Sequence, residues 1–161
     1  MKVYVKNKLI SMSGKSYVYD ENKNHVFKVK GSVFSLRRKK TICDLDGKKL
    51  YVVKNRLINW WMPKAMIYDA DGNKIATVRV AFKKFVVDDY KEQIQVESNF
   101  FKLTATITRN GQPIGTVKRE FFALADSFQI EAEEADIPFL VTLVIAIDNI
   151  QDKIQKDTCS T

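Results

Sequence analysis

The chain is built from short stretches in which apolar and polar residues alternate, the pattern of a β-strand with one buried face. Residues 75–80 place Ala76, Val78 and Val80 on one face, and residues 93–97 and 103–108 alternate in the same way. The pattern predicts about twelve short strands. So many antiparallel strands normally close into a barrel or stack as sheets, because either arrangement hides their edges.

A repeated turn unit separates these strands. Asp-Gly or Asn-Gly pairs occur at residues 46–47, 71–72 and 110–111, and a degenerate copy, Asn-Lys, occurs at residues 22–23. Glycine adopts the positive φ of a tight hairpin turn without a Cβ clash, and Asp or Asn tolerates it. A further hairpin is expected around residues 88–91. The repeat therefore predicts an architecture of consecutive β-hairpins.

Clusters of aromatic and large apolar residues lie in the other connections between strands. They occur at residues 33–36, 57–61, 81–85, 100–103 and 121–124. Such residues can pin each corner onto the core, or they can form a stacking surface for nucleic-acid bases. Their regular placement favours packing against the core.

Residues 137–147 form the longest uncharged run, eleven residues against the roughly 20 that a membrane-spanning helix needs. The β-branched residues in the run favour a strand. Asp136 as N-cap, Pro138 in the first turn and the apolar spacing of residues 147, 150 and 154 favour a helix. We predict a helix over about residues 137–154. A helix that is apolar on all sides must be buried on all sides, and a barrel of about twelve strands is wide enough to contain it.

These patterns predict a mainly β protein, an antiparallel closed barrel of about twelve strands arranged as repeated hairpins around a central hydrophobic C-terminal helix. A length of 161 residues suits one domain. The expected domain covers residues 1–154, and residues 155–161 form a polar C-terminal tail.

The net charge of the protein indicates which classes of partner it attracts. The formal net charge is +8, which attracts anionic lipid, nucleic acid or an acidic protein, although a basic surface can also serve solubility alone. The two cysteines, Cys43 and Cys159, form no CxxC pair and no disulfide framework. The N-terminus has no signal-peptide pattern. The sequence therefore predicts a protein of the reducing cytoplasm.

Two basic clusters are the candidate anion-binding residues. They are Arg37, Arg38, Lys39 and Lys40 in one connection, and Lys83 and Lys84 in another. If the clusters share a face, they can hold an anionic lipid head group through phosphate contacts. The alternative is a solvated surface on which lysines protect strand edges.

Catalytic and metal-binding motifs are not evident in the sequence. Residues 69–72 resemble the start of a calcium loop, but Gly72 falls fourth instead of sixth and Val80 takes the place of the glutamate at the twelfth position. His25 has no Cys or His at zinc-ligand spacing. The acidic run at residues 131–136 suits a helix N-terminus. We expect no enzymatic activity, no metal and no cofactor.

The turn units, corners such as Val-Phe-Ser-Leu at residues 33–36, and residues 126–136 leading into residues 138–148 resemble the bacterial members of the LURP-one-related family. That family is grouped with the tubby C-terminal domain and the phospholipid scramblases. The resemblance spans about residues 3–152 and implies a twelve-stranded barrel around a central helix. It also implies lipid-related roles, since tubby-like domains bind phosphoinositide head groups through basic residues and scramblases move or bind lipids and are linked to calcium.

The expected function is that of a non-enzymatic binding module for anionic lipid head groups or an acidic partner, which would place it in the cytoplasm at the inner membrane surface. Two alternatives remain open. One is nucleic-acid binding through a basic face that exposes Trp60 and Trp61. The other is an apolar-ligand carrier with its ligand beside the helix, opposed by the expectation that the helix fills the lumen.

Overall fold

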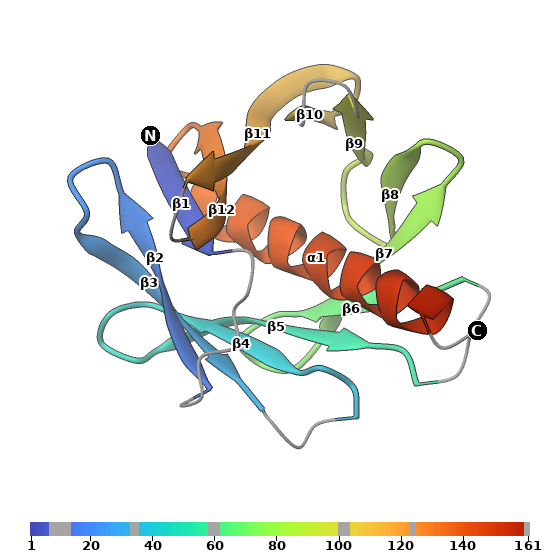
Figure 1. Cartoon of the computed structure of the whole chain (residues 1–161), viewed down its shortest axis with the longest axis horizontal. Helices are drawn as coiled ribbons and strands as arrows, with labels where there is room; N and C mark the ends of the chain where they lie inside the picture. The colour runs from blue at the N-terminus through green and yellow to red at the C-terminus, as the bar shows by residue number, and fades with distance from the viewer. Residues whose placement is uncertain (7–13, 33–35, 58–61, 100–103, 123–124, 160–161) are drawn as a thin grey trace.

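A computed structural model describes residues 1–6, 14–32, 36–57, 62–99, 104–122 and 125–159. This part of the chain contains twelve β-strands followed by an α-helix (Figure 1). The elements are β1 Lys2–Lys6, β2 Lys15–Asp20, β3 His25–Gly31, β4 Lys40–Cys43, β5 Lys49–Asn55, β6 Lys64–Tyr68, β7 Lys74–Ala81, β8 Lys84–Asp88, β9 Ile94–Asn99, β10 Thr104–Arg109, β11 Gln112–Phe122, β12 Ala125–Ala132 and α1 Ile137–Cys159.

The strands form one closed antiparallel barrel in which each strand pairs with its neighbours in the sequence. The first and last strands close it, because Val3 of β1 pairs with Ile130 of β12 on one side and with Asp20 of β2 on the other. Closure removes the strand edges that would otherwise invite aggregation. The predicted twelve-stranded barrel is confirmed, in preference to stacked sheets.

The predicted turn units form hairpin turns. Gly47, Gly72 and Gly111 have φ angles of 92°, 91° and 80°, a region in which a Cβ atom is unfavourable. In the degenerate copy Lys23 adopts φ of 64° in place of a glycine, and Asp89 adopts 63° in the predicted turn between β8 and β9. Local turn chemistry was therefore readable from the sequence.

The predicted alternation along the strands is also confirmed. Ala76 and Val78 of β7 are fully buried, as is Ile94 of β9, and Val96 is nearly so. Because these side chains point into the barrel, they meet the apolar surface of α1. The inner faces of the strands and the helix form a single hydrophobic core.

Helix α1 begins at Ile137, as predicted, and its N-terminal part is buried on all sides, with Leu140, Leu143 and Ile145 fully inaccessible. The predicted end near Ile154 is wrong, since the helix continues to Cys159. The residues after Ile154 contain neither Gly nor Pro, so nothing in them stops the helix. Most of the predicted polar tail at residues 155–161 is helical.

The helix lies inside the barrel but away from its axis. It packs most closely on β5 and β6 and less closely on β7 and β12. Near its start it also approaches β11, where a Cβ atom on Gly115 would lie only 2.8 Å from Leu140 Cδ1. Farther along, a cavity separates it from the strands of the opposite wall. The helix thus fills the lumen near its start and leaves space beside the part from Val144 to Ile154.

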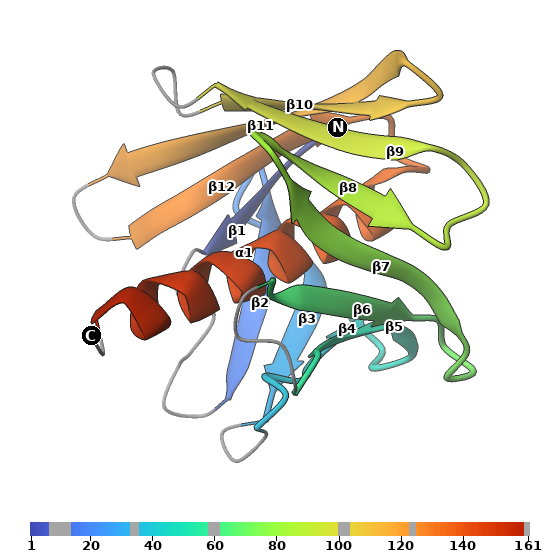
Figure 2. The ribbon, with the colours of Figure 1, turned by 90° about the vertical axis from the view of Figure 1, so that its right-hand side faces the viewer.

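The antiparallel order gives the barrel two ends. Even-numbered strands finish at the end where α1 begins, which we call the turn end, and odd-numbered strands finish at the other, which we call the C-terminal end. In Figure 2 the turns after β6, β8 and β10 lie on the right and the C-terminus of α1 lies on the left. The hairpin turns are therefore segregated from the connections that carry the aromatic clusters.

Candidate basic and apolar binding site at one end of the barrel

The turn end is rich in carboxylates. They lie in the hairpin turns and on the approach to α1, at Asp20, Glu21, Asp44, Asp46, Asp69, Asp71, Asp88, Asp89, Glu92, Glu131, Glu133, Glu134 and Asp136. The cations at this end, which include Lys2, Lys23, Lys48, Lys49, Lys74, Lys91 and Arg109, are fewer than the carboxylates. This end of the barrel therefore carries a small excess of acidic residues.

Asp69 illustrates the structural use of these carboxylates. Its Oδ1 accepts hydrogen bonds from the backbone N–H groups of Asp71 and Asn73, at 3.0 and 2.9 Å. The side chain of Asn73 also donates to Asp69, and this bond is the main reason why the pKa of the Asp69 carboxyl lies below its usual value. The segment that resembled a calcium loop is a β-turn held by its own aspartate.

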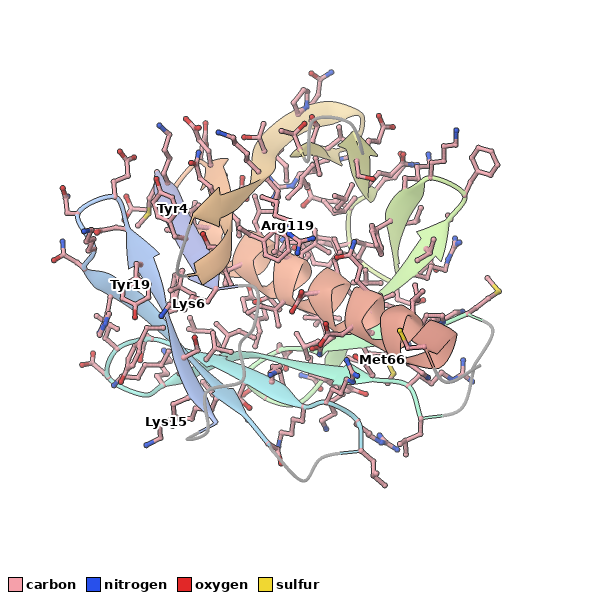
Figure 3. The ribbon with its side chains drawn as sticks, in the orientation of Figure 1. Tyr4, Lys6, Lys15, Tyr19, Met66 and Arg119 are labelled. Carbon is pink, nitrogen blue, oxygen red and sulfur yellow. The ribbon has the colours of Figure 1, made fainter. Side chains whose placement is uncertain are left out.

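The C-terminal end is rich in cations. They lie at the ends of odd-numbered strands, at the starts of even-numbered strands and on α1, at Lys6, Lys15, Lys30, Arg37, Arg38, Lys39, Lys40, Lys54, Arg56, Lys64, Lys83, Lys84, Arg119 and Lys153. Figure 3 labels Lys6, Lys15 and Arg119 of this group. The carboxylates here whose side chains the structure describes are Glu97, Asp148 and Asp152. The protein's charge is therefore separated along the barrel.

Large apolar side chains are exposed at the same end. Leu36 is 90% exposed and Phe82 is 94% exposed, and Leu57 and Met62 are also exposed. The prediction that the corner residues pack onto the core is wrong for Leu36, Leu57 and Phe82, which lie beyond the strand ends, whereas Phe85 of β8 does pack against the core. Residues 33–35, 58–61, 100–103 and 123–124 of these corners lie outside the described residues.

The predicted cluster at residues 37–40 divides into two pairs. Arg37 and Lys39 are exposed at the C-terminal end. Arg38 instead pairs with Asp152 of α1 at 3.3 Å. Lys40 is partly buried, and desolvation lowers the pKa of its ammonium group despite the opposing charges of Asp148 and Asp152. One half of the cluster therefore faces solvent and the other half faces the helix.

A buried pair of asparagines holds this cluster in place. Asn149 of α1 donates from Nδ2 to the carbonyl oxygen of Arg38 at 3.0 Å. Asn55 of β5 donates from Nδ2 to the carbonyl oxygen of Asn149 at 3.2 Å, and its backbone N–H donates to the carbonyl oxygen of Arg37 at 2.7 Å. Both asparagines are 4% exposed. We call this set the asparagine clamp, and it fixes α1 to the connection before β4.

Lys83 and Lys84 lie on another wall of the same end. Lys83 is exposed beside the Phe82 ring, with Nζ 5.9 Å from the ring centroid. Lys84 is partly buried and donates to Gln95 Oε1 at 2.8 Å. The two predicted clusters therefore share an end of the barrel, where they lie on separate hairpins.

A cavity of about 410 Å³ opens beside Lys83. It lies between the part of α1 from Val144 to Ile154 and the wall formed by β7–β12. Most of its lining is apolar, with Arg119 of β11 on its side. Figure 3 shows Arg119 pointing toward α1. The sequence left open a ligand site beside the helix, and the opposing expectation that the helix fills the lumen is wrong along the part of α1 that lines the cavity. The position of the cavity was not readable from the sequence, because it depends on how the helix leans within the barrel.

Asp148 is a second feature that the sequence did not single out. Burial chiefly, and the charge of Asp152 next, raise the pKa of its carboxyl to about 7, while Lys40, Arg119 and Arg38 oppose that rise. Its position in the polar part of a predicted buried helix was the available signal, since a carboxylate there needs a partner. Asp148 thus lies between the two walls that carry the basic residues.

The other residues that the sequence analysis considered make structural contacts or lie outside the described residues. His25 stacks on Tyr17 with ring centroids 4.0 Å apart. Within the described ranges, His, Cys, Asp and Glu side chains form no group of three that could ligate a metal ion. Trp60 and Trp61 lie outside the described residues. The carboxylate of Asp136, the predicted N-cap, pairs with Arg109 at 2.6 Å while its backbone carbonyl accepts from the Leu140 N–H.

For the part of the chain that the structure describes, helix α1 is not apolar enough over a sufficient length to cross a bilayer. This agrees with the prediction that residues 137–147 are not a transmembrane segment. The charged and amide residues of its C-terminal half account for the result.

Comparisons with known proteins agree with the fold. The chain resembles the uncharacterized protein YxjI of Bacillus subtilis, with 23% identity over 155 residues that cover 93% of both chains. Its fold matches the X-ray structure of an Arabidopsis thaliana protein with a TM-score of 0.66 and 17% identity, over 93% of this chain and 91% of the other. The family model described as LURP-one-related matches residues 1–148. The chain belongs to the LURP-one-related family.

Proposed function

We propose that this protein is a non-enzymatic module that docks on anionic lipid surfaces with the C-terminal end of its barrel. The observation that carries the proposal is the coincidence of cations and exposed apolar residues at that end, opposite an acidic turn end. Phe82 and Leu36 extend beyond the strands beside Lys83 and Arg37. Apolar tips within a basic surface suit the boundary between anionic head groups and acyl chains.

The free energy that each cation contributes is small, which favours binding by many weak contacts. Each Lys or Arg near an anionic membrane contributes about 1 kcal/mol, and the contribution falls off within a Debye length. Arg37, Arg56 and Lys83 are exposed and can act in this way. The carboxylates of the turn end are repelled by the same surface, so the charge separation orients the barrel as well as attracting it. The resemblance to tubby-like domains, which bind phosphoinositide head groups, supports the same function.

Vesicle flotation at physiological salt tests the proposal. Binding is expected with vesicles that contain phosphatidylserine and not with pure phosphatidylcholine. Replacing Arg37, Arg56 and Lys30 together by Gln removes three exposed cations from the C-terminal end. At about 1 kcal/mol each, their loss is expected to weaken binding roughly a hundredfold.

The matched control replaces Lys48, Lys49 and Lys91 by Gln, which removes three exposed cations from the turn end. This variant carries the same net charge but is expected to bind almost as well as the unchanged protein. Equal losses for the two triple variants would show attraction by net charge without orientation. Equal binding to neutral and anionic vesicles would overturn the proposal, and preferential binding to an RNA or an acidic protein would favour the alternative functions.

A further inference from the structure

The cavity beside α1 has an exposed mouth and a dry floor. Phe82 at the mouth is 94% exposed and Ile154 is 41% exposed. On the floor, Val96, Val117 and Val144 are buried, each less than a tenth exposed. The cavity therefore runs from the C-terminal end of the barrel into its core, along the side of the helix that packing does not fill.

The cations of the lining lie on three parts of the wall. Lys83 and Lys84 come from the turn and strand that follow β7, and Arg119 comes from β11, three strands farther along the same wall. The neutral polar side chains of the lining are Gln151 and two hydroxyl residues. Among the described residues that line the cavity none carries a carboxylate, although Lys84 donates to Gln95 and the charge of Arg119 interacts with that of Asp148 nearby.

Size and polarity together define a class of ligand. A volume of about 410 Å³ is in the range of sites that hold small molecules, which is about 300–1,000 Å³. An apolar floor does not hold water well, since water there would lack hydrogen-bond partners. The complementary ligand has a flexible apolar chain for the floor and one anionic group for the cations.

We propose that this cavity binds a single linear acyl chain that ends in an anionic head. The chain lies along α1 between Val144 and Val117, and the head lies near Lys83, Lys84 and Arg119. A free fatty acid has this chemistry, and so does an acyl chain that a membrane phospholipid inserts. The site borders the docking surface proposed above and shares Phe82 and Lys83 with it, but a free fatty acid needs no membrane in order to enter it.

The first test varies the length of the acyl chain. Calorimetry measures the affinity of octanoate, decanoate and laurate below their micelle concentrations. Each methylene that enters an apolar site contributes about 0.8 kcal/mol, so affinity is expected to rise roughly fourfold per added methylene until the cavity is full. Dodecanol, which has the same chain as laurate and no charge, is expected to bind at least fivefold more weakly.

Variants of the floor and the mouth locate the site. Ala105 of β10 also lines the cavity and is partly buried. Val117→Trp and Ala105→Leu fill the cavity by different amounts and are expected to reduce laurate affinity, Val117→Trp at least tenfold and Ala105→Leu less. Lys83→Gln at the exposed mouth is expected to reduce laurate affinity severalfold without changing dodecanol affinity. Lys91→Gln is the matched control at the turn end and is expected to change neither. Thermal unfolding of each variant establishes that it is folded.

Binding to vesicles distinguishes a free fatty acid from an acyl chain that belongs to a membrane phospholipid. If laurate binds in solution and the folded floor variants lose it, the cavity accepts free fatty acids. If laurate fails to bind but the folded floor variants dock more weakly on phosphatidylserine vesicles, the ligand is an acyl chain of the membrane. If folded floor variants match the unchanged protein in both measurements, the proposal is overturned. That result would leave the docking proposal intact, because its triple variant changes residues on the other walls.

Discussion

At the turn end of the barrel, short connections are held by their own side chains, whereas at the C-terminal end the chain presents cations, exposed apolar residues and a cavity. Tyr90 stacks on Phe139 at the turn end with ring centroids 4.5 Å apart. Arg109 there pairs with Asp136 and lies 3.2 Å from Glu92. These contacts fix the start of α1 in the lumen.

The C-terminal end holds the same helix by polar contacts instead. Asn149 and Asn55 form the asparagine clamp, and Arg38 pairs with Asp152. The contacts at the turn end stabilise the barrel, whereas the C-terminal end leaves side chains and a cavity available for binding. This is common in proteins in which a rigid scaffold positions binding residues at one edge.

The largest expected effect separates the tightly packed start of α1 from the part of the helix that borders the cavity. Leu140→Ala removes a fully buried side chain at the tightly packed start and is expected to lower the free energy of unfolding by about 2–5 kcal/mol. Ile147→Ala changes a partly buried side chain that borders the cavity, and the expected loss is about 1 kcal/mol. Urea unfolding measures both. Similar losses would contradict unequal packing along the helix.

The asparagine clamp gives the next effect. Asn149→Ala removes a buried side chain and leaves the partly buried carbonyl oxygen of Arg38 without this donor, so the free energy of unfolding is expected to fall by about 1–3 kcal/mol. Asn22→Ala removes an exposed side chain from a turn and serves as the control. An unchanged urea midpoint for Asn149→Ala would show that the clamp does not stabilise the C-terminal end.

Asp148 should make this end sensitive to pH. Its pKa is about 7 in the folded protein and near 3.9 in an unfolded chain, so the folded state binds the proton more tightly between these values. Stability conferred by the protonated form is full below about pH 4 and is lost as pH rises through about 7. The groups around Asp148 are Lys40, Arg119, Arg38 and Asp152.

Asp148→Asn removes this dependence. Between about pH 5 and pH 8 the unchanged protein is expected to lose on the order of 1–3 kcal/mol of unfolding free energy relative to the variant. Urea unfolding at both pH values gives the difference. Asp46→Asn, in an exposed turn at the opposite end, is the control. Parallel pH profiles for Asp148→Asn and the unchanged protein would rule out titration of this carboxyl.

The smallest expected change in the free energy of unfolding concerns a hairpin turn at the turn end. Lys23 adopts φ of 64° in the place that glycine takes in the other turn units. Lys23→Gly is therefore expected to raise the free energy of unfolding by about 0.5–1 kcal/mol, because it relieves the left-handed conformation. Gly72→Ala makes the opposite change and is expected to lower it by a similar amount. Thermal unfolding compares the pair, and a loss for Lys23→Gly would contradict strain at that turn.

The sequence by itself determined the local elements. Asp-Gly and Asn-Gly pairs set the turns because few residues accept positive φ, and alternation set the inward faces of the strands because successive side chains point to opposite sides. Asp136 and Pro138 marked the start of α1 at Ile137. Twelve strands with alternating apolar faces also indicated closure, since an open sheet of that kind would expose its edges.

Only the tertiary structure decided what the two ends and the lumen contain. Antiparallel pairing places the acidic turns at one end and the basic connections at the other, and closure of the barrel brings residues that are far apart in the sequence around the same rim. The cavity exists because α1 packs against β5 and β6 and leaves the far wall uncovered beyond Val144. The pKa of Asp148 is raised by burial, and its neighbours Lys40 and Arg119 come from distant strands. Such properties depend on distances between elements, which local sequence patterns do not encode.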